Sequence, residues 1–317
     1  MRERTITAIF ITLGLALAFL FREVNLYVFD GFIAILSIVC ALEVSRVFLR
    51  SGRANFMGLE ATFATITFIM TIWGINAQFS LSQFILGYLI ILIVMFSISF
   101  AMGFFNKRTV EEDENFKASK LGIYEYSYKK SMLTLFIMIY PTLLFVPMYL
   151  LNHIQELNLF TGAVNAYTGV NLGLFLLVTV FLVTMATDTL ALLVGMTLKG
   201  PKLAPLISPK KTISGAIGGL FGGMVMAVAL FLLASWFTPL GDAFSAAGIQ
   251  FWLFIIYGFV ASIISQIGDL FASYIKRRAR AKDFSSVLPG HGGFMDRLDG
   301  ILFNAVFSFI FFMIVLL

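Results

Sequence analysis

An apolar run without a single charged side chain occupies residues 83–104, with the sequence QFILGYLIILIVMFSISFAMGF. A helix needs about 20 such residues to cross the hydrocarbon core of a bilayer. Within lipid, only helices and closed barrels satisfy all of their backbone hydrogen bonds. Because this run is continuous and does not alternate between polar and apolar residues, it predicts a membrane-spanning helix and not a barrel strand.

The composition of the whole chain is also that of a membrane protein. Apolar residues make up 60% of the 317 positions, and only 12% of the residues are charged. A soluble domain keeps about a quarter of its residues charged, so this chain lacks the polar residues to cover a water-facing surface. The single cysteine, Cys40, excludes an internal disulfide and a cysteine-based zinc site. The two histidines, His153 and His291, are too few for a histidine metal cluster.

Runs of the same kind predict an all-α polytopic integral membrane protein with about nine transmembrane helices. The expected spans are residues 5–21, 31–49, 56–75, 83–104, 131–151, 172–197, 214–238, 250–275 and 299–317. The first span could be a cleavable signal peptide, because Ala16-Leu17-Ala18 resembles a cleavage site. Its apolar run continues through Phe21, so we expect a helix that is retained.

The basic residues indicate how the chain is oriented. If the N-terminus is cytoplasmic, 21 of the 22 lysines and arginines fall in cytoplasmic loops, and only Arg22 lies outside. Such a split is typical of multi-pass proteins, and we expect this one to lie in the cytoplasmic membrane with its functional site facing the cytoplasm. The net charge of +5 is explained by this topology and gives no reason to expect a nucleic-acid partner.

Two regions are predicted along the chain. The first, residues 1–130, holds spans one to four and a polar cytoplasmic segment, residues 105–130. The second, residues 131–317, holds spans five to nine, and charged and glycine-rich features concentrate in it after residue 185. We therefore expect the chemistry to reside in the second region.

Four acids fall within the predicted spans, where a charge is costly and usually marks a partner or a function. Glu43 precedes Arg46 by three residues, so an ion pair at the interface is a sufficient explanation for it. Glu60 lies close to the same interface and is explained in the same way. Asp188 and Asp269 are harder to explain and are candidate functional residues.

One stripe of the eighth predicted helix is expected to hold Asp269, Ser273, Lys276 and Arg280, because these residues recur at helical spacing. Two interpretations stay open for this stripe. An internal Asp–Lys pair would only neutralise the end of the helix, whereas a functional site would use the acid.

The segment before the last span combines glycines with acids. Gly290, Gly292 and Gly293 let the backbone approach a ligand closely and present N–H groups to phosphate oxygens. Asp296 and Asp299 are hard oxygen ligands of the kind that Mg²⁺ prefers. Nearby cations can neutralise phosphate charge: Lys276, Arg277, Lys282 and Arg297.

A second basic segment, residues 208–215 (SPKKTISG), opens the seventh span. Lys210 and Lys211 precede two hydroxyl residues, Thr212 and Ser214, either of which can cap the helix. The free N–H groups at such a helix start suit an anion. Glycines follow, three of them at four-residue spacing (Gly215, Gly219 and Gly223) and two more at Gly218 and Gly222, and they are expected to let neighbouring helices pack closely.

The segment from Ser273 to Asp299 resembles the signature of the phosphatidate cytidylyltransferases, also called CDP-diacylglycerol synthases. Two patterns carry the resemblance, S-x-I-K-R-x4-K-D and P-G-H-G-G-x-x-D-R-x-D. The likeness extends more loosely to Asp188 and to residues 208–219, and covers about residues 185–317. Residues 195–200 depart from the family, whose corresponding segment is rich in Gly and Arg and ends in Gly-Lys. The last helix also lacks the proline that often follows the final aspartate.

The resemblance implies that CMP is transferred from CTP to phosphatidate, with release of pyrophosphate. It implies Mg²⁺ held by Asp269 and Asp296, to which we add Asp299, in an all-helical, probably dimeric membrane protein with a polar funnel open to the cytoplasm. The expected catalytic residues are Asp269, Asp296, Lys282 and Arg297. The expected substrate-binding residues are Asp188, Lys210, Lys211, Ser214, Ser273, Lys276, Arg277, Gly290, His291, Gly292 and Gly293. For His291 we expect a hydrogen-bonding or loop-shaping role in preference to that of a base.

Two other functions are compatible with parts of the pattern. A related enzyme, either a CTP-dependent transferase acting on another lipid phosphate or a lipid kinase, would carry similar basic loops. A transporter could use Asp188 and Asp269 as an ion relay. Transport is less well supported, because the sequence predicts no pair of helices broken in the middle of the membrane.

Overall fold

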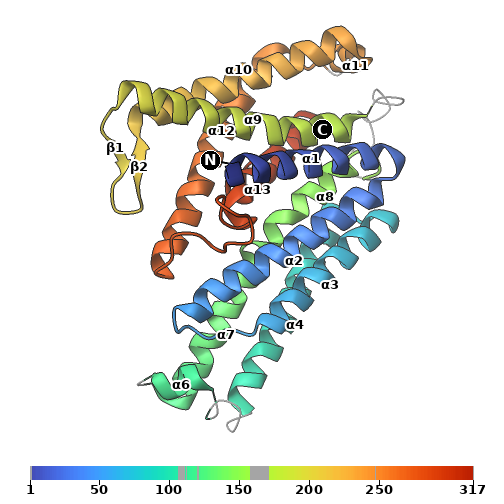
Figure 1. Ribbon diagram of the computed structural model, residues 1–317. Coiled ribbons are helices and arrows are strands. Elements are labelled where there is room, and N and C mark those ends of the chain that lie inside the picture. The colour runs from blue at the N-terminus through green and yellow to red at the C-terminus, as the bar shows by residue number, and fades with distance from the viewer. Residues whose placement is uncertain are drawn as a thin grey trace. The chain divides into compact units, whose positions relative to one another are not determined.

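The computed structural model describes residues 2–105, 111, 113–119, 121–157, 171–246 and 248–316. Part of the predicted cytoplasmic segment, namely residues 106–110, 112 and 120, lies outside the described residues. The described chain is almost entirely helical and contains one two-stranded hairpin (Figure 1). The predicted all-α class is therefore confirmed.

Eight helical segments among the described residues are long and apolar enough to cross a membrane. They match predicted spans two to nine: Leu26–Arg50 (α2), Met57–Asn76 (α3), Leu81–Phe105 (α4), Ile123–Asn152 (α7 to α8), Leu172–Leu198 (α9), Ile213–Phe237 (α10), Phe251–Arg278 (α12) and Met295–Val315, within α13 (Met295–Leu316). Helix α1 (Arg2–Val24) covers the first predicted span. The chain is thus a polytopic helical membrane protein.

The fifth span is interrupted near its middle. Helix α7 (Ile123–Ile139) is followed by a short 3-10 helix, η1 (Thr142–Phe145), and by α8 (Val146–Asn152). Pro141 lies between α7 and η1, and a proline has no N–H with which to continue a helix. The span also begins well before the predicted residue 131, because Ile123 and the residues after it already form the first turns of α7.

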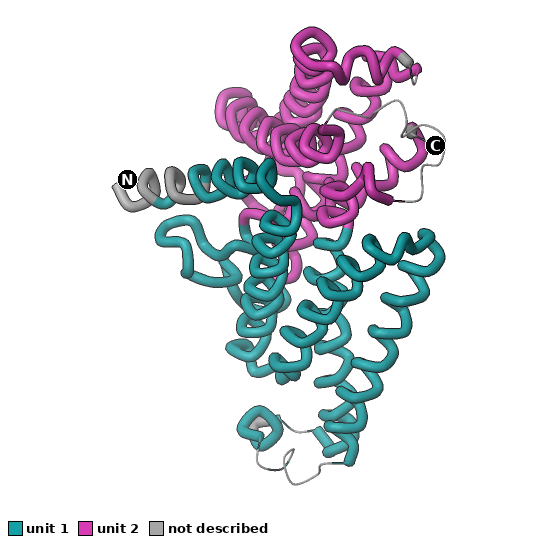
Figure 2. Tube along the Cα trace, turned by 90° about the vertical axis from the view of Figure 1, so that its right-hand side faces the viewer, with its two compact units in different colours: residues 1–146, 278–296 teal, residues 147–277, 297–317 magenta. Residues whose placement is uncertain are grey.

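The chain forms two compact units, which Figure 2 shows in teal and magenta. Unit 1 comprises residues 1–146 and 278–296, and unit 2 comprises residues 147–277 and 297–317. The glycine-rich segment therefore folds with the N-terminal helices. The predicted division of the membrane region after residue 130 stays a prediction.

Unit 1 is built from α1 to α4 and α7, and α2 packs against α1, α3 and α7. One apolar cluster at its core joins Phe63, Met95 and Met138 from three different helices. A short helix, α6 (Glu114–Ala118), precedes α7, and the Nζ of Lys130 lies 2.9 Å from Oδ2 of Asp113, the residue that caps α6.

In unit 2, α9 and α10 lie side by side (Figure 1). A methyl group on Gly222 would lie 2.7 Å from the carbonyl oxygen of Ala186, and one on Gly218 would lie 2.5 Å from Val194. These contacts leave no room for side chains at the two positions. The prediction that the glycines allow close helix packing is confirmed.

Polar side chains tie α13 to α9 and α12 within unit 2. The amide of Asn304 donates to Thr184 Oγ1 (2.9 Å) and to the carbonyl of Val180 (3.1 Å). Ser308 Oγ donates to Asn304 Oδ1 (3.2 Å) and lies 2.7 Å from the hydroxyl of Tyr257. Hydrogen bonds between membrane helices fix their rotation and spacing, so this network sets how the three helices face one another.

A hairpin joins α9 to α10, where the sequence predicted a loop. Strands β1 (Lys202–Ala204) and β2 (Ser208–Thr212) pair antiparallel, with Lys202 opposite Thr212. Thr212 then caps α10, since its Oγ1 accepts the N–H of Gly215 at 3.1 Å. This confirms one of the two predicted caps and fixes Lys211 directly before the helix.

Candidate active site

Three carboxylates from three helices gather in unit 2: Asp188 on α9, Asp269 on α12 and Asp299 on α13. The charge of Asp269 acts on both of the other acids, and that of Asp188 also acts on Asp299. Asp299 is only 7% exposed, whereas Asp188 is exposed and Asp269 is partly buried. Like charges repel one another, more strongly where water is scarce, so the cluster depends on neighbouring cations.

Those cations come from three places in unit 2. Lys211 Nζ lies 2.5 Å from Oδ2 of Asp269, and its charge also attracts Asp188. Arg297 attracts Asp188, and Lys276 attracts Asp299. The structure therefore brings together six of the predicted site residues: Asp188, Lys211, Asp269, Lys276, Arg297 and Asp299.

The predicted stripe along the eighth span needs two corrections. The ion-pair partner of Asp269 is Lys211 from the hairpin and not Lys276 from its own helix. Helix α12 ends at Arg278, and Arg280 lies beyond it with a positive φ of 53°, so Arg280 is not on the helix. Ser273 does lie on the stripe, with its Oγ 3.5 Å from Asp269 Oδ1.

Three other predicted residues of unit 2 lie around the hairpin. Lys210 is exposed on β2 beside Lys211. Ser214 Oγ accepts the N–H of Gly200 at 3.2 Å and thereby holds the chain where it leaves α9. Arg277 Nε donates to the carbonyl of Ile207 at 3.3 Å and thus ties the end of α12 to the hairpin turn.

The glycine loop, which we define as residues 284–296, belongs to unit 1 and contains a tight turn. The N–H of His291 donates to the carbonyl of Leu288 at 2.9 Å, and the N–H of Leu288 donates to the carbonyl of Gly292 at 2.9 Å. Gly290 and Gly292 have φ values of +74° and +87°, which side chains disfavour. The turn itself therefore requires both glycines.

Asp296 closes this loop. Its Oδ2 accepts the backbone N–H groups of Phe284 (2.8 Å) and Gly293 (2.9 Å), which lie near the two ends of the loop. Lys282 is exposed just before the loop begins. The predicted site residues of unit 1 are thus Lys282, Gly290, His291, Gly292, Gly293 and Asp296.

A second carboxylate lies at the loop, that of Glu43, which was not among the predicted site residues. Its side chain is 2% exposed, and its Oε1 accepts from Ser285 Oγ (2.6 Å) and from the N–H of Phe294 (3.1 Å), while Oε2 accepts from the N–H of Met295 (2.9 Å). The expected ion pair with Arg46 is therefore wrong, because the loop donates to both oxygens. An acid inside an apolar run was the available signal.

The donor chemistry in unit 2 fits Mg²⁺. Asp188, Asp269 and Asp299 offer hard oxygen ligands whose mutual repulsion a divalent cation would relieve. Within the part of the chain that the structure describes, no group of three or more His, Cys, Asp or Glu side chains is arranged to hold a metal alone. Mg²⁺ normally takes one or two carboxylates and completes its shell with water and substrate phosphates, so a partial protein shell suits it.

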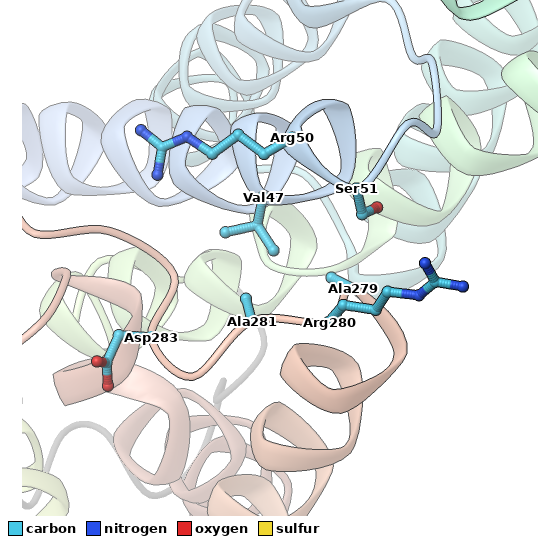
Figure 3. Close-up of a pocket in the computed structure, with 7 residues that line it drawn as sticks. All are labelled: Val47, Arg50, Ser51, Ala279, Arg280, Ala281 and Asp283. Carbon is cyan, nitrogen blue, oxygen red and sulfur yellow. The ribbon is translucent and has the colours of Figure 1, made fainter. Parts of the chain in front are cut away.

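A cavity of about 310 Å³ lies in unit 1 between the end of α2 and the chain that precedes the glycine loop (Figure 3). Val47 points into it, whereas the guanidinium groups of Arg50 and Arg280 extend in opposite directions. The predicted site residues do not line this cavity. Three of the seven residues that line it are charged, namely Arg50, Arg280 and Asp283.

The fold and the charge pattern define a helical integral membrane protein whose polar residues suit a ligand that carries phosphate. The chain belongs to the Cytidylyltransferase family, which matches residues 2–315.

Curated relatives agree with this family. A phosphatidate cytidylyltransferase of Brucella abortus biovar 1 (strain 9-941) is 39% identical over 143 residues, which are 44% of this chain and 47% of the relative. Phosphatidate cytidylyltransferases of Rickettsia conorii (37% over 136 residues) and Rickettsia typhi (41% over 125 residues) match 43% and 39% of this chain, and 57% and 53% of their own. The chain thus spans about half the length of the curated relatives it matches.

Proposed function

We propose that this chain transfers CMP from CTP to phosphatidate, forming CDP-diacylglycerol and pyrophosphate with the help of Mg²⁺. The proposal places it in the cytoplasmic membrane, with the N-terminus and the active site on the cytoplasmic side. It is supported by membership of the Cytidylyltransferase family and by the similarity to phosphatidate cytidylyltransferases. The basic loops are consistent with this orientation.

The observation that carries the proposal is the charge cluster of Asp188, Asp269 and Asp299 with Lys211. A nucleotide triphosphate brings several negative charges and its own Mg²⁺, so its site needs carboxylates for the metal and cations for the phosphates. The cluster supplies both the carboxylates and the cations, and their charges interact with one another. A site that bound only an apolar lipid tail would gain nothing from this arrangement.

In the proposed reaction, a phosphate oxygen of phosphatidate attacks the α-phosphorus of CTP. A bond forms between that oxygen and the α-phosphorus, and the bond from the α-phosphorus to the bridging oxygen of the β-phosphate breaks, so that pyrophosphate leaves with the bonding electrons. A phosphate monoester is already largely ionised at pH 7, and the attack needs no general base. Catalysis then depends on positioning and on charge neutralisation.

The residues of this chain divide these tasks. Asp269 and Asp296 are proposed as the main carboxylates for Mg²⁺, and Asp299 as a third. Mg²⁺, when bound, supplies Lewis-acid neutralisation of phosphate charge. Cations are proposed to contact the CTP phosphates (Lys210, Lys211, Lys282 and Arg297) and the lipid phosphate (Lys276 and Arg277). We further propose that the protein acts as a homodimer.

The test uses the purified full chain in mixed micelles with radiolabelled CTP, phosphatidate and Mg²⁺. We expect label to appear in lipid for the wild type and to be lost in Asp269→Asn and in Asp296→Asn. Asp242→Asn changes an exposed acid on the short helix α11 (Leu240–Ala246) and serves as the matched control, which should keep full activity. If both site variants stay active, the metal assignment is wrong although the reaction stands.

Two further arms test the acceptor. If label reaches another lipid phosphate but not phosphatidate, the chain is a related transferase. If well-folded protein transfers nothing from CTP, while vesicles that contain it take up ions, the enzyme proposal fails.

A further inference from the structure

The carboxylate of Glu43 lies inside unit 1 at the meeting point of α2 and the glycine loop. It accepts three hydrogen bonds, one from Ser285 Oγ at 2.6 Å and two from the N–H groups of Phe294 and Met295 at 3.1 and 2.9 Å. The side chain is 2% exposed, so these bonds replace water as its solvation. A carboxylate buried in this way holds its donors tightly, because breaking any of the bonds leaves a charge unsolvated.

The chemical form of this side chain is dictated by its partners. All three groups that face Glu43 donate hydrogen bonds, and only a carboxylate offers acceptors on both of its terminal atoms. A glutamine of the same size would turn an NH₂ group toward one of the donors. The N–H groups of Phe294 and Met295 also precede or open the first turn of α13, where free backbone N–H groups and the helix dipole favour a negative charge.

Gly293 is fitted to the same carboxylate. A methyl group at this position would lie 2.5 Å from Oε2 of Glu43 and 2.7 Å from its Cδ and Oε1. Such separations are far shorter than a van der Waals contact, so a side chain at residue 293 requires Glu43 to move. The glycine is thus needed for the close approach of Glu43.

Glu43 and Asp296 act on the same short stretch of backbone. Asp296 Oδ2 accepts the N–H of Gly293 at 2.9 Å, and Glu43 accepts from the next two N–H groups in the chain. Three consecutive backbone donors are therefore fixed by two carboxylates, one from within the loop and one from α2. A shift of the backbone at Phe294 would also shift Asp296, which follows two residues later.

We propose that Glu43 is a positioning residue of the reaction: it holds the glycine loop so that the turn at Gly290–Gly292 and the carboxylate of Asp296 stand where the reacting groups need them. This inference rests on the proposed function, since it assigns Glu43 a part in CMP transfer. It also gives the N-terminal half of the chain a defined role, because a residue of α2 orders the loop that carries the most specific sequence pattern.

The experiment compares Glu43→Gln with wild type in the full chain, using steady-state CMP transfer and hydrogen–deuterium exchange of the peptide that covers residues 284–296. We expect kcat to fall by ~100-fold, as misplacement of a catalytic group by about 1 Å can do, with little change in the KM for CTP. Exchange at Phe294 and Met295 should become faster. Ser285→Ala, which removes one of the three donors, should give a smaller loss of the same kind.

The matched control is Glu60→Gln. Glu60 is a second fully buried acid of unit 1, on α3, and the hydroxyl groups beside it, those of Ser45 and Thr134, belong to α2 and α7 and not to the glycine loop. The same substitution there should leave kcat and the exchange of residues 284–296 unchanged. Loss of activity in both variants to the same extent would assign the effect to general destabilisation and overturn the proposal.

A rescue experiment separates positioning from ligand contact at Gly293. Gly293→Ala alone should lose activity, because the new methyl group displaces Glu43. Glu43→Asp withdraws the carboxylate by one methylene. The double variant should therefore be about tenfold more active than Gly293→Ala alone, because residues in contact are energetically coupled. If the double variant is no better than Gly293→Ala, the methyl group obstructs something other than Glu43 and the proposal is wrong.

The exchange measurement does not depend on turnover. If wild-type protein fails to transfer CMP while Glu43→Gln still speeds exchange at Phe294 and Met295, the proposed function fails and the loop-holding role of Glu43 survives. If the wild type is active and Glu43→Gln retains its kcat, the positioning role is refuted and the proposed function stands.

Discussion

Lys211 Nζ lies 2.5 Å from Oδ2 of Asp269 and thereby joins the hairpin to α12 by an ion pair within unit 2. Both side chains are partly exposed, at 26% and 33%, so ligands can reach them. The pair places a positive charge where a divalent cation would otherwise approach Asp269. Binding of Mg²⁺ and of phosphates should therefore respond in opposite ways to the loss of this lysine.

We expect Lys211→Met to lower kcat, because a phosphate contact is lost, and yet to lower the Mg²⁺ concentration needed for half-maximal activity. Removal of a neighbouring cation strengthens the attraction of Asp269 for the metal, by ~3- to 10-fold for a divalent ion about 6–12 Å from the lost charge at a water-like dielectric constant of about 80. Lys202→Met, on the other strand of the hairpin, is the control and should change neither quantity. A rise in the Mg²⁺ requirement of Lys211→Met would contradict the argument.

Close packing of α9 and α10 predicts a large cost for Gly222→Ala. The new methyl group would meet the backbone oxygen of Ala186 at 2.7 Å, and a backbone atom of a packed helix cannot move cheaply. We expect a loss of about 1–3 kcal/mol in the free energy of unfolding, measured by thermal or denaturant unfolding in detergent.

Gly31→Ala on α2 is the matched comparison. Nothing lies within 4 Å of the methyl group it would add, so the gain in helix propensity should dominate and stabilise the protein by up to about 1 kcal/mol. Equal effects of the two substitutions would show that contact with α9 is not what Gly222 provides.

The pH dependence of stability should reveal the pair of Asp113 and Lys130. Burial alone would raise the pKa of Asp113, but the hydrogen bond and charge of Lys130, with the N–H of Asn115, hold this pKa below its usual 3.8. A lowered pKa in the folded state stabilises the protein above the unfolded-state pKa, and this contribution disappears as the pH falls through the folded-state value.

Asp113→Asn should therefore lower the unfolding temperature at pH 7, and the difference from wild type should shrink below pH 3.8. The exposed pair of Glu125 and Lys129, whose side chains are 56% and 57% exposed, supplies the control: Glu125→Gln should change the free energy of unfolding by less than ~0.5 kcal/mol. A difference for Asp113→Asn that does not vary with pH would refute the role of its charge.

The cap of α10 makes a separate prediction. Thr212→Val keeps the shape of the side chain but removes the oxygen that accepts the N–H of Gly215, and should cost about 1 kcal/mol. Thr212→Ser keeps the oxygen and should stay near wild type in the same unfolding measurement. If both variants lose equally, the methyl group and not the cap is what matters at this position.

Hydrophobic runs alone predicted where the helices lie, because length and apolar character decide whether a helix can cross a bilayer. Their ends were less predictable. Ile123 starts the fifth span early because polar residues of α7 are helical without being apolar, and Pro141 interrupts this span. The hairpin was missed because residues 208–212 show no apolar alternation and contain Pro209, which a short edge strand tolerates.

The candidate site was predictable in its residue types and less so in its pairings. Aspartates, lysines and glycines at fixed spacing pointed to phosphate and Mg²⁺, and spacing along one helix offered a pair of Asp269 with Lys276 as one of two interpretations. The actual partner, Lys211, lies on a hairpin that no local sequence pattern predicts. Glu43 is the clearest example of a contact that the sequence does not predict. Its hydrogen-bond donors lie more than 240 positions away in the chain, and only the fold brings them to it.

Helix α13 carries Asp296 in its first turn and Asp299 in its second, and it continues as a single helix to Leu316. At 1.5 Å per residue it is about 33 Å long, close to the ~30 Å of a bilayer core. A helix adapts to a thinner membrane by tilting and to a thicker one by standing upright, and either change moves its first turn relative to the headgroups. We therefore expect the acyl-chain length of the surrounding lipids to change the depth of Asp296 and Asp299 relative to the headgroups.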